Sequence, residues 1–175
     1  VKAKYRKPLV ILTPKSLLRL PAAVSTVAEL AQGSFQTLID DTNGIKDPKT
    51  VLICSGKIYY ELAARCFERK ITDIAILRLE QIYPFPRDRL QKAAKKYASA
   101  TKWCWVQEEP ENMGAWQFVR RRIEAVIKQS LAYIGREASS SPATGFPTIF
   151  RREQNEIIEK AVGPLAGSRQ PAEVG

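Results

Sequence analysis

Short apolar runs rich in β-formers alternate along the chain with segments whose apolar residues recur at helical spacing. This alternation predicts an α/β fold with a mostly parallel sheet covered on both faces. Strands are expected at residues 8–14, 35–41, 50–56, 73–82, 102–107 and 131–136. The turn-rich residues after 35–41 make that stretch a plausible edge strand, whereas 50–56 is continuously apolar and typical of a buried one.

Helix-start signals stand near the N-terminus. Thr13 is expected to cap a short helical turn whose first residue is Pro14, and Pro21 interrupts that turn. Thr26 with Glu29 three residues later has capping-box spacing, which predicts the start of a second helix.

Three longer helices are predicted by their apolar faces, and residues 148–162 form a closing helix. The expected apolar faces are Tyr59, Leu62, Ala63, Cys66 and Phe67; Leu90, Ala94, Tyr97 and Ala98; and Trp116, Val119, Ile123, Val126 and Ile127. Gly56 is expected to permit the tight turn into the first of these helices.

Composition fits one soluble domain, because 45% of the 175 residues are apolar and 26% are charged. We expect that domain over residues 1–163 and a disordered Pro/Gly-rich tail over 164–175. Without a membrane-length apolar run or a secretory signal, the chain is interpreted as intracellular with no membrane partner. Its formal charge of +10 is dispersed rather than gathered in one tract, which disfavours a nucleic-acid partner.

Two residue counts restrict the chemistry. The sequence contains no histidine, so the side chain best suited to proton transfer near neutral pH is missing. Cys54, Cys66 and Cys104 are widely spaced within apolar stretches, which indicates buried free thiols rather than disulfides or a metal site. We therefore expect no catalytic residue and no metal ligand in this chain.

The stretch "CSGKIYY" at 54–60 places a strand, a glycine turn and a helix start in order. Ser55 and Lys57 could form an anion site there, since free backbone N–H groups gather at a helix N-terminus. The motif lacks further glycines, so an ordinary strand-to-helix turn is the favoured interpretation.

The acidic stretch "EEPENMG" lies where a strand meets a helix. Glu108 and Glu109 could share a proton, with one pKa raised by the other charge. The alternative is structural: Asn112 caps the following helix, Glu109 and Glu111 lie near its positive end, and Gly114 permits close chain approach. The residues favour the structural alternative.

Basic residues concentrate near the N-terminus, where Arg6, Lys7, Lys15 and Arg19 surround one expected strand and turn. They could bind a phosphate-bearing ligand through bidentate contacts, or they could simply be solvated. The tryptophans at 103, 105 and 116 suit either a core or a subunit interface.

Five stretches together resemble the C-terminal region of the 2-oxoglutarate dehydrogenase decarboxylating component, in order, from Tyr5 to about Val162. They are "YRKPLVILTPKSLLR", "SGKIYYELAAR", "RLEQIYPFP", "WVQEEPENMGAW" and "SPATG". The resemblance implies a transketolase C-terminal-like fold: a three-layer α/β/α sandwich around a five-stranded, mostly parallel mixed sheet. Residues 35–41 are a candidate for its antiparallel strand.

The resemblance also implies a function. Complete enzymes of this family use thiamine diphosphate and magnesium to decarboxylate 2-oxoglutarate, then succinylate a lipoyl group of the succinyltransferase component in the tricarboxylic acid cycle. The cofactor-binding regions lie upstream in relatives, so we expect no cofactor in this chain and an inactive isolated domain. We expect it to support upstream domains and a homodimer, in the bacterial cytoplasm or mitochondrial matrix.

Regulation by acetyl-CoA or AMP is a further implication of the resemblance. Arg6, with Lys15 and Arg19, is expected to contact the effector's phosphate. Effector-responsive relatives are expected to carry a lysine immediately before the residue matching Phe35, whereas this chain has Ser34 there, which predicts that acetyl-CoA affinity is reduced or lost. Glu108, Glu109, Asn112 and Trp116 are expected to shape their loop or meet a neighbouring domain.

Two questions stay open from the sequence. The substrate of the complete enzyme could be 2-oxoglutarate or 2-oxoadipate, because the pocket lies elsewhere. The rival to an enzyme domain is a free-standing module that binds an acyl-CoA or a nucleotide as a stable monomer.

Overall fold

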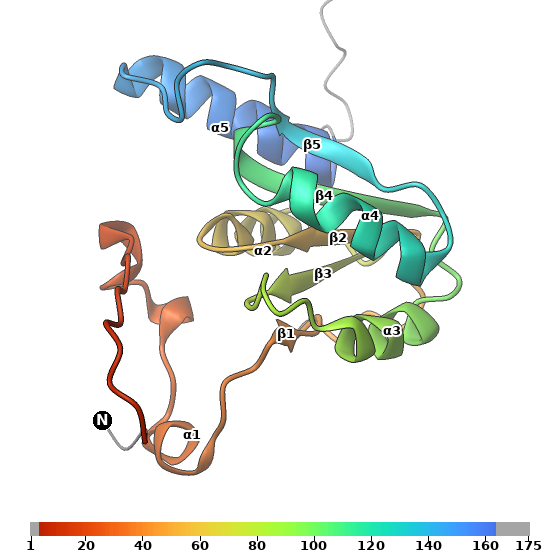
Figure 1. The fold of residues 1–175 in the computed structure, drawn as a ribbon. Coiled ribbons are helices and arrows are strands. Elements are labelled where there is room, and N and C mark those ends of the chain that lie inside the picture. Colours follow the sequence, from red (N-terminus) through yellow and green to blue (C-terminus); the bar gives the residue numbers. More distant parts are fainter. Residues whose placement is uncertain (1–3, 164–175) are drawn as a thin grey trace, which may run out of the picture. The chain divides into compact units, whose positions relative to one another are not determined.

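The computed structural model describes residues 4–163, and the chain divides into two compact units between Ser34 and Phe35. The expected tail at 164–175 lies outside the described residues. Each unit has its own internal contacts. Figure 1 shows the elements of both.

The described part of the N-terminal unit, residues 4–34, has three short helices: η1 (Lys15–Leu17), η2 (Pro21–Ala23) and α1 (Val27–Gln32). The capping box of α1 is confirmed, because the Glu29 backbone N–H donates to Thr26 Oγ1 at 3.2 Å and the Thr26 N–H donates to Glu29 Oε2 at 2.7 Å. The Thr26 N–H, and after it the Thr26 hydroxyl at 2.9 Å, donate to the Glu29 carboxylate and lower the pKa of that carboxyl.

Two N-terminal predictions are wrong. Residues 8–14 form no strand, because their backbone finds no strand partner among residues 4–163. Thr13 does not cap the following turn; Pro14 occupies the N-cap position of η1 and no side chain accepts a capping hydrogen bond. The turn itself is a single 3-10 helix.

The second unit is built on a five-stranded sheet with the order β1-β3-β2-β4-β5. Its strands are β1 (Leu38–Ile39), β2 (Thr50–Cys54), β3 (Ile74–Leu79), β4 (Lys102–Pro110) and β5 (Ala132–Arg136). All neighbours are parallel except β1, which pairs antiparallel with β3. The prediction that 35–41 supplies the antiparallel edge strand is therefore confirmed.

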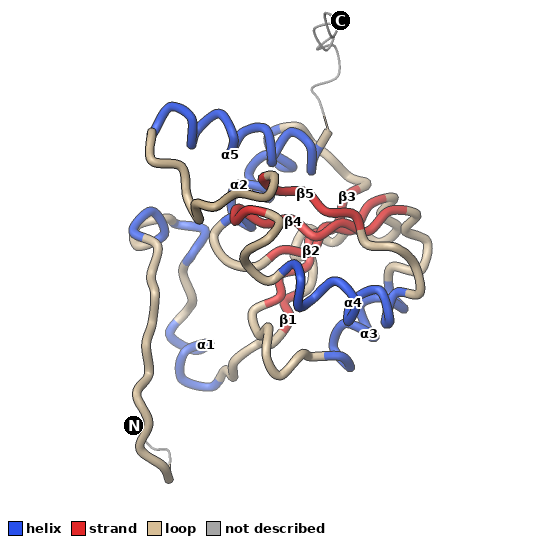
Figure 2. Tube along the Cα trace, turned by 45° about the horizontal axis from the view of Figure 1, so that its top comes forward, coloured by secondary structure: helices blue, strands red, loops and turns tan. Residues whose placement is uncertain are grey.

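Helices cover both faces of this sheet, as Figures 1 and 2 show. They are α2 (Ile58–Glu68), α3 (Arg87–Lys96), α4 (Trp116–Ile127) and α5 (Pro147–Val162). One apolar core joins the sheet to α3 and α4, and a second joins it to α2 and α5. Alternate residues of β4 enter the two cores, since Trp105 lies in the first and Cys104 in the second. The predicted three-layer sandwich is confirmed.

The helix faces agree with the sequence except at two positions. Phe67 is 85% exposed on α2, where Ile58, Leu62 and Cys66 are buried instead. Ala98 is exposed after α3, and Ala93 is buried in its place. In both cases the apolar stripe is rotated by one residue, because helical periodicity defines a face only to within a neighbouring position.

Candidate functional site

The best-placed site of the second unit lies at the carboxyl ends of β2 and β4. These strands are neighbours, but β2 leads into α2 on one face and β4 leads into α4 on the other. Open α/β sheets bind ligands in the crevice at such a switch point. The sequence candidates "CSGKIYY" and "EEPENMG" follow these two strands, so the fold brings both to one edge.

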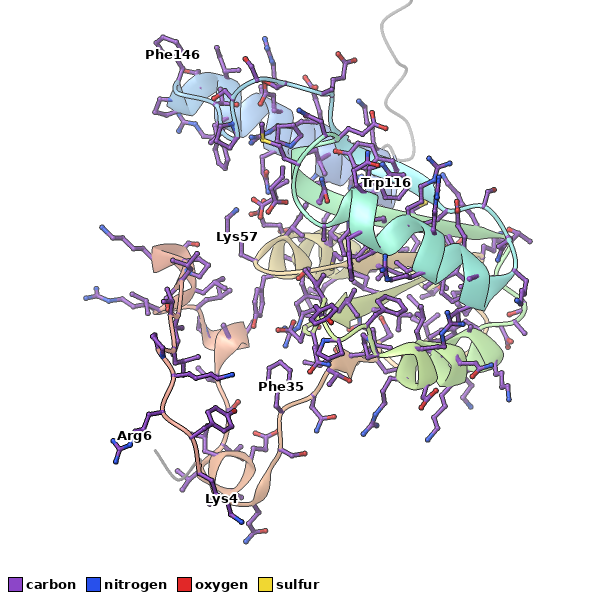
Figure 3. The ribbon with its side chains drawn as sticks, viewed as in Figure 1. Lys4, Arg6, Phe35, Lys57, Trp116 and Phe146 are labelled. Carbon is purple, nitrogen blue, oxygen red and sulfur yellow. The ribbon has the colours of Figure 1, made fainter. Side chains whose placement is uncertain are left out.

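On the α2/α5 face, Lys57 and Glu108 form an ion pair across the switch point. Lys57 Nζ also lies 3.6 Å from Glu61 Oε1, and it makes a cation–π contact with the Phe150 ring, 5.7 Å from the ring centroid. Gln154 of α5 donates to Glu108 Oε1 at 2.9 Å. Figure 3 shows Lys57 beside the start of α2. Because two carboxylates already neutralise Lys57, the structure favours an ordinary strand-to-helix turn over an anion site here. Gly56 makes this turn at φ +78°.

Glu108 and Glu109 lie on opposite faces of β4, since Glu108 contacts Lys57 and Gln154 on the α2/α5 face and Glu109 lines a cavity on the α4 face. Glu108 is partly buried against α2 and α5, whereas Glu109 is exposed. β4 also runs through this pair to Pro110, further than the sequence indicated. The arrangement therefore does not place the two carboxylates together to share a proton.

Gln107 organises the loop after β4 and was not singled out from the sequence. Its Oε1 accepts from the Trp105 indole at 2.8 Å and from the Trp116 backbone N–H at 3.2 Å. Its amide nitrogen donates to the carbonyls of Glu109, Pro110 and Met113. The buried amide of Gln107 thus satisfies hydrogen-bonding groups at both ends of the loop. In the sequence, this role was signalled only by a polar residue at the end of an apolar strand.

Asn112 and Trp116 also hold this loop. Asn112 does not cap α4, contrary to the structural interpretation of the loop; Ala115 is the N-cap. Its side chain pairs with the Ser139 backbone in both directions, at 3.0 Å each. The Trp116 ring is buried and packs 5.1 Å from the Tyr133 ring, so it lies in the core.

A cavity of about 340 Å³ opens beside the switch point on the α4 face. It is lined by Ser55, Gly56, Ile82, Trp105, Gln107, Glu109, Gly114, Ala115 and Phe118. Gln107 uses its amide on the loop, which leaves Ser55 and Glu109 as the polar groups facing this space. Neither has a base or a second acid beside it, so the lining supplies no catalytic set.

A larger cavity of about 530 Å³ lies beyond β5, between the serine-rich loop and α5. Arg136 lines it with Nε 3.1 Å from Glu153 Oε2, and Thr144 donates to the same carboxylate at 2.6 Å. Acidic and basic residues are mixed in its wall, so it carries no strong preference for an anion.

The basic residues proposed for an effector lie in the N-terminal unit. Arg6 precedes the extended stretch 8–13, Lys15 opens η1, and Arg19 follows it; all three are exposed. Figure 3 labels Arg6 in the N-terminal unit, and Figure 2 draws residues 8–13 as a loop. Arg6 and Lys15 are nine residues apart, up to about 30 Å in an extended chain, so the structure does not gather them.

The three cysteines are free and buried, as predicted. Burial raises the pKa of the Cys54 thiol to about 12 and that of Cys66 to about 11, which removes the reactive thiolate at neutral pH. Among residues 4–163 no cluster of acidic or cysteine side chains is arranged to hold a metal ion. No helix in that same range is long and apolar enough to cross a membrane.

The fold of the second unit defines its class: a three-layer α/β domain. Its fold is similar to a solved split-gene transketolase, an inactive beta4 tetramer, with a TM-score of 0.50 and 12% identity over 73% of this chain and 43% of that chain. At this identity the likeness shows the fold alone.

The family follows from the sequence comparisons. Residues 24–162 match the family described as 2-oxoglutarate dehydrogenase C-terminal, and the chain belongs to it. It is 44% identical over 163 residues to the 2-oxoglutarate dehydrogenase E1 component of Haemophilus influenzae, covering 91% of this chain and 17% of the relative. It is 46% identical over 167 residues to the E1 component of Cupriavidus necator, covering 93% and 18%. The chain thus spans less than a fifth of these relatives, and the resemblance found in the sequence is confirmed.

Proposed function

We propose that this chain works as the noncatalytic C-terminal domain of a complete E1 enzyme. That enzyme oxidatively decarboxylates 2-oxoglutarate and transfers the succinyl group to the lipoyl arm of the succinyltransferase component. The observation that supports this most is the family match over residues 24–162, together with identities of 44% and 46% to E1 components. We place the enzyme in the bacterial cytoplasm or the mitochondrial matrix.

The groups at the switch point between β2 and β4 do not suit a thiamine diphosphate site. Lys57 is the one cation at the glycine turn of the switch point, and Glu108 and Glu61 already neutralise it. The nearby carboxylate of Glu108 is likewise engaged by Lys57 and Gln154. We therefore assign thiamine diphosphate and magnesium to the upstream regions of the complete enzyme.

Within that enzyme the domain would support the upstream domains and a homodimer. The loop held by Gln107, Asn112 and Trp116 is rigidly tied at several points, which suits a fixed contact surface. Glu109 is exposed on this loop and could meet a neighbouring domain, whereas Glu108 and Trp116 shape the loop from inside.

The test of this function uses the complete polypeptide that carries the domain. With thiamine diphosphate, magnesium and a ferricyanide acceptor, it should decarboxylate 2-oxoglutarate; 2-oxoadipate is run in parallel, since either could be the substrate. Turnover with neither substrate would contradict the proposal. Calorimetry with the 175-residue chain should show no magnesium-dependent binding of thiamine diphosphate, and tight binding there would reject its noncatalytic role.

We also propose an effector contact at Arg6, supported by its exposed guanidinium, which makes no ion pair or hydrogen bond within residues 4–163. Acetyl-CoA and AMP are titrated into the complete enzyme and its Arg6→Ala variant, with Arg121→Ala, an exposed arginine of α4, as the control. Weaker binding by Arg6→Ala alone supports the contact, while equal binding by all three removes Arg6. Lys15→Ala and Arg19→Ala show whether those residues share it.

The rival function is a free-standing module that binds an acyl-CoA or a nucleotide. It predicts that the 175-residue chain is a stable monomer that binds such a ligand unaided. Ultracentrifugation and calorimetry on that chain distinguish the two, because a domain of a larger enzyme should self-associate through its uncovered apolar residues.

A further inference from the structure

Residues 8–13 combine apolar side chains with an unpaired backbone. Leu9, Val10, Ile11 and Leu12 are 74% to 91% exposed. Within residues 4–163, the backbone N–H and C=O groups of this stretch make no hydrogen bond. Figures 1 and 2 show it as an open path with neither helix nor strand. Such a stretch is a ready template for pairing with another strand.

The order of side chains says what kind of strand it would be. In an extended chain Leu9 and Ile11 point to one face and Val10 and Leu12 to the other, so both faces are apolar. Strands apolar on both faces belong to parallel sheets covered by helices on each side. Arg6 and Lys7 before the run, and Lys15 after it, limit the strand to an ordinary length of about six residues.

Residues 8–13 belong to the N-terminal compact unit, and the five-stranded sheet is assembled without them. These residues also precede the family match, which begins at residue 24. Sequence similarity to the E1 components nevertheless covers 91% to 93% of this chain, and more than four fifths of each relative lies outside it. The rest of that longer polypeptide is therefore the expected source of the strand that pairs with residues 8–13.

We propose that residues 8–13 form a β-strand in the sheet of the domain that precedes this one in the complete enzyme, with a neighbouring strand on each side. The inference rests on the proposed function, because it needs that longer polypeptide. The strand anchors the C-terminal domain to the preceding one through main-chain hydrogen bonds. It also places Arg6 and Lys15 at opposite ends, up to about 30 Å apart, so they contact different groups and not one phosphate.

Hydrogen exchange on the complete enzyme and on the 175-residue chain tests the strand without any substitution. The amides of Val10, Ile11 and Leu12 should exchange about 100-fold or more slowly in the complete enzyme than in the isolated chain. Equal, fast exchange in both would overturn the proposal. Slow exchange in the isolated chain that disappears on dilution would also overturn it, since the partner would then be a second copy.

Proline substitutions test the two-sided pairing. Consecutive N–H groups of a strand point to opposite neighbours, so Val10→Pro and Ile11→Pro should each remove protection across 8–13 and lower the melting temperature of the complete enzyme. Ile11→Thr keeps the donor and the β-branched shape, and serves as the control that stays protected. An effect from only one proline would overturn the internal position and indicate an edge strand.

Activity separates this inference from the proposed function. Decarboxylation is measured on the same wild-type preparation used for hydrogen exchange. An active enzyme with fast-exchanging 8–13 amides would overturn the strand alone. Protected amides in an enzyme inactive on both 2-oxo acids would support the strand and contradict the proposed function.

Discussion

The ammonium of Lys57 and the carboxylate of Glu108 close the switch point between β2 and β4. Both side chains are mostly withdrawn from water, and Gln154 adds a hydrogen bond to the same carboxylate. A crevice that holds ligands in other sheets of this type is here bridged by a structural ion pair. The pair connects residues 51 positions apart and ties α2, β4 and α5 together.

Replacing Glu108 by glutamine should destabilise the chain by about 1–2 kcal/mol, because a partly buried ammonium loses its main carboxylate partner. Glu109→Gln is the matched control, since its side chain is exposed one residue away, and it should cost less than about 0.5 kcal/mol. Urea unfolding at pH 7 measures both. In the complete enzyme, folded Glu108→Gln should retain turnover; loss of turnover with intact assembly would restore a catalytic role.

A second prediction concerns Gln107. Gln107→Leu should cost about 3 kcal/mol or more, because the Trp105 indole, the Trp116 N–H and the carbonyls of the loop lose their common partner. Gln117→Ala is the control, because that exposed residue makes one long hydrogen bond at 3.4 Å. Urea unfolding followed by tryptophan fluorescence reports both variants. Equal stability of the two would show that the loop does not depend on the Gln107 amide.

The third prediction uses two glycines of different surroundings. Gly114 has φ +65°, and an added Cβ would lie 2.9 Å from Gln107 Oε1 and 3.1 Å from its Cδ. Gly114→Ala should therefore destabilise the chain by about 2 kcal/mol through backbone strain and displacement of the amide. Gly145→Ala meets nothing within 4 Å and should change stability by less than about 0.5 kcal/mol. Thermal unfolding of both variants measures the difference. Equal melting temperatures would contradict the close approach of Gly114 to the Gln107 side chain.

The sequence was sufficient for the sheet and its covering helices, because buried strands and amphipathic helices carry their periodicity locally. It failed for residues 8–13, whose strand pattern is clear but whose pairing partner is absent from residues 4–163. The local pattern of apolar residues predicts an extended backbone, but a β-strand also needs hydrogen bonds to a neighbouring strand.

The switch-point contacts could not be read from the sequence for a related reason. Lys57 and Glu108 are far apart in the chain, and only the strand order brings them together. Gln107 lies within the stretch "WVQEEPENMGAW", but that motif does not show the role of the residue, which comes from the five hydrogen-bonding groups that converge on its amide. The hypothesis that Glu108 and Glu109 share a proton is wrong because β4 continues through Glu109 and the two side chains lie on opposite faces of that strand.

The fourth prediction concerns Asp40, which ties the end of β1 to the end of α3. Burial acts to raise the pKa of Asp40, but hydrogen bonds from Lys96 Nζ at 2.6 Å, Tyr97 Oη at 2.7 Å and the Asp41 N–H outweigh it, so the pKa lies below its ordinary value. A lowered folded-state pKa gives stability that is present above the unfolded value, near pH 4, and is lost as the pH falls through the folded value. Asp40→Asn should therefore cost about 1 kcal/mol at pH 7, reduced by the partial exposure of the group, and progressively less below pH 4. Urea unfolding from pH 7 to pH 2.5 measures this, with the exposed Asp47→Asn as control; a penalty that does not shrink in acid would show that the Asp40 charge contributes nothing.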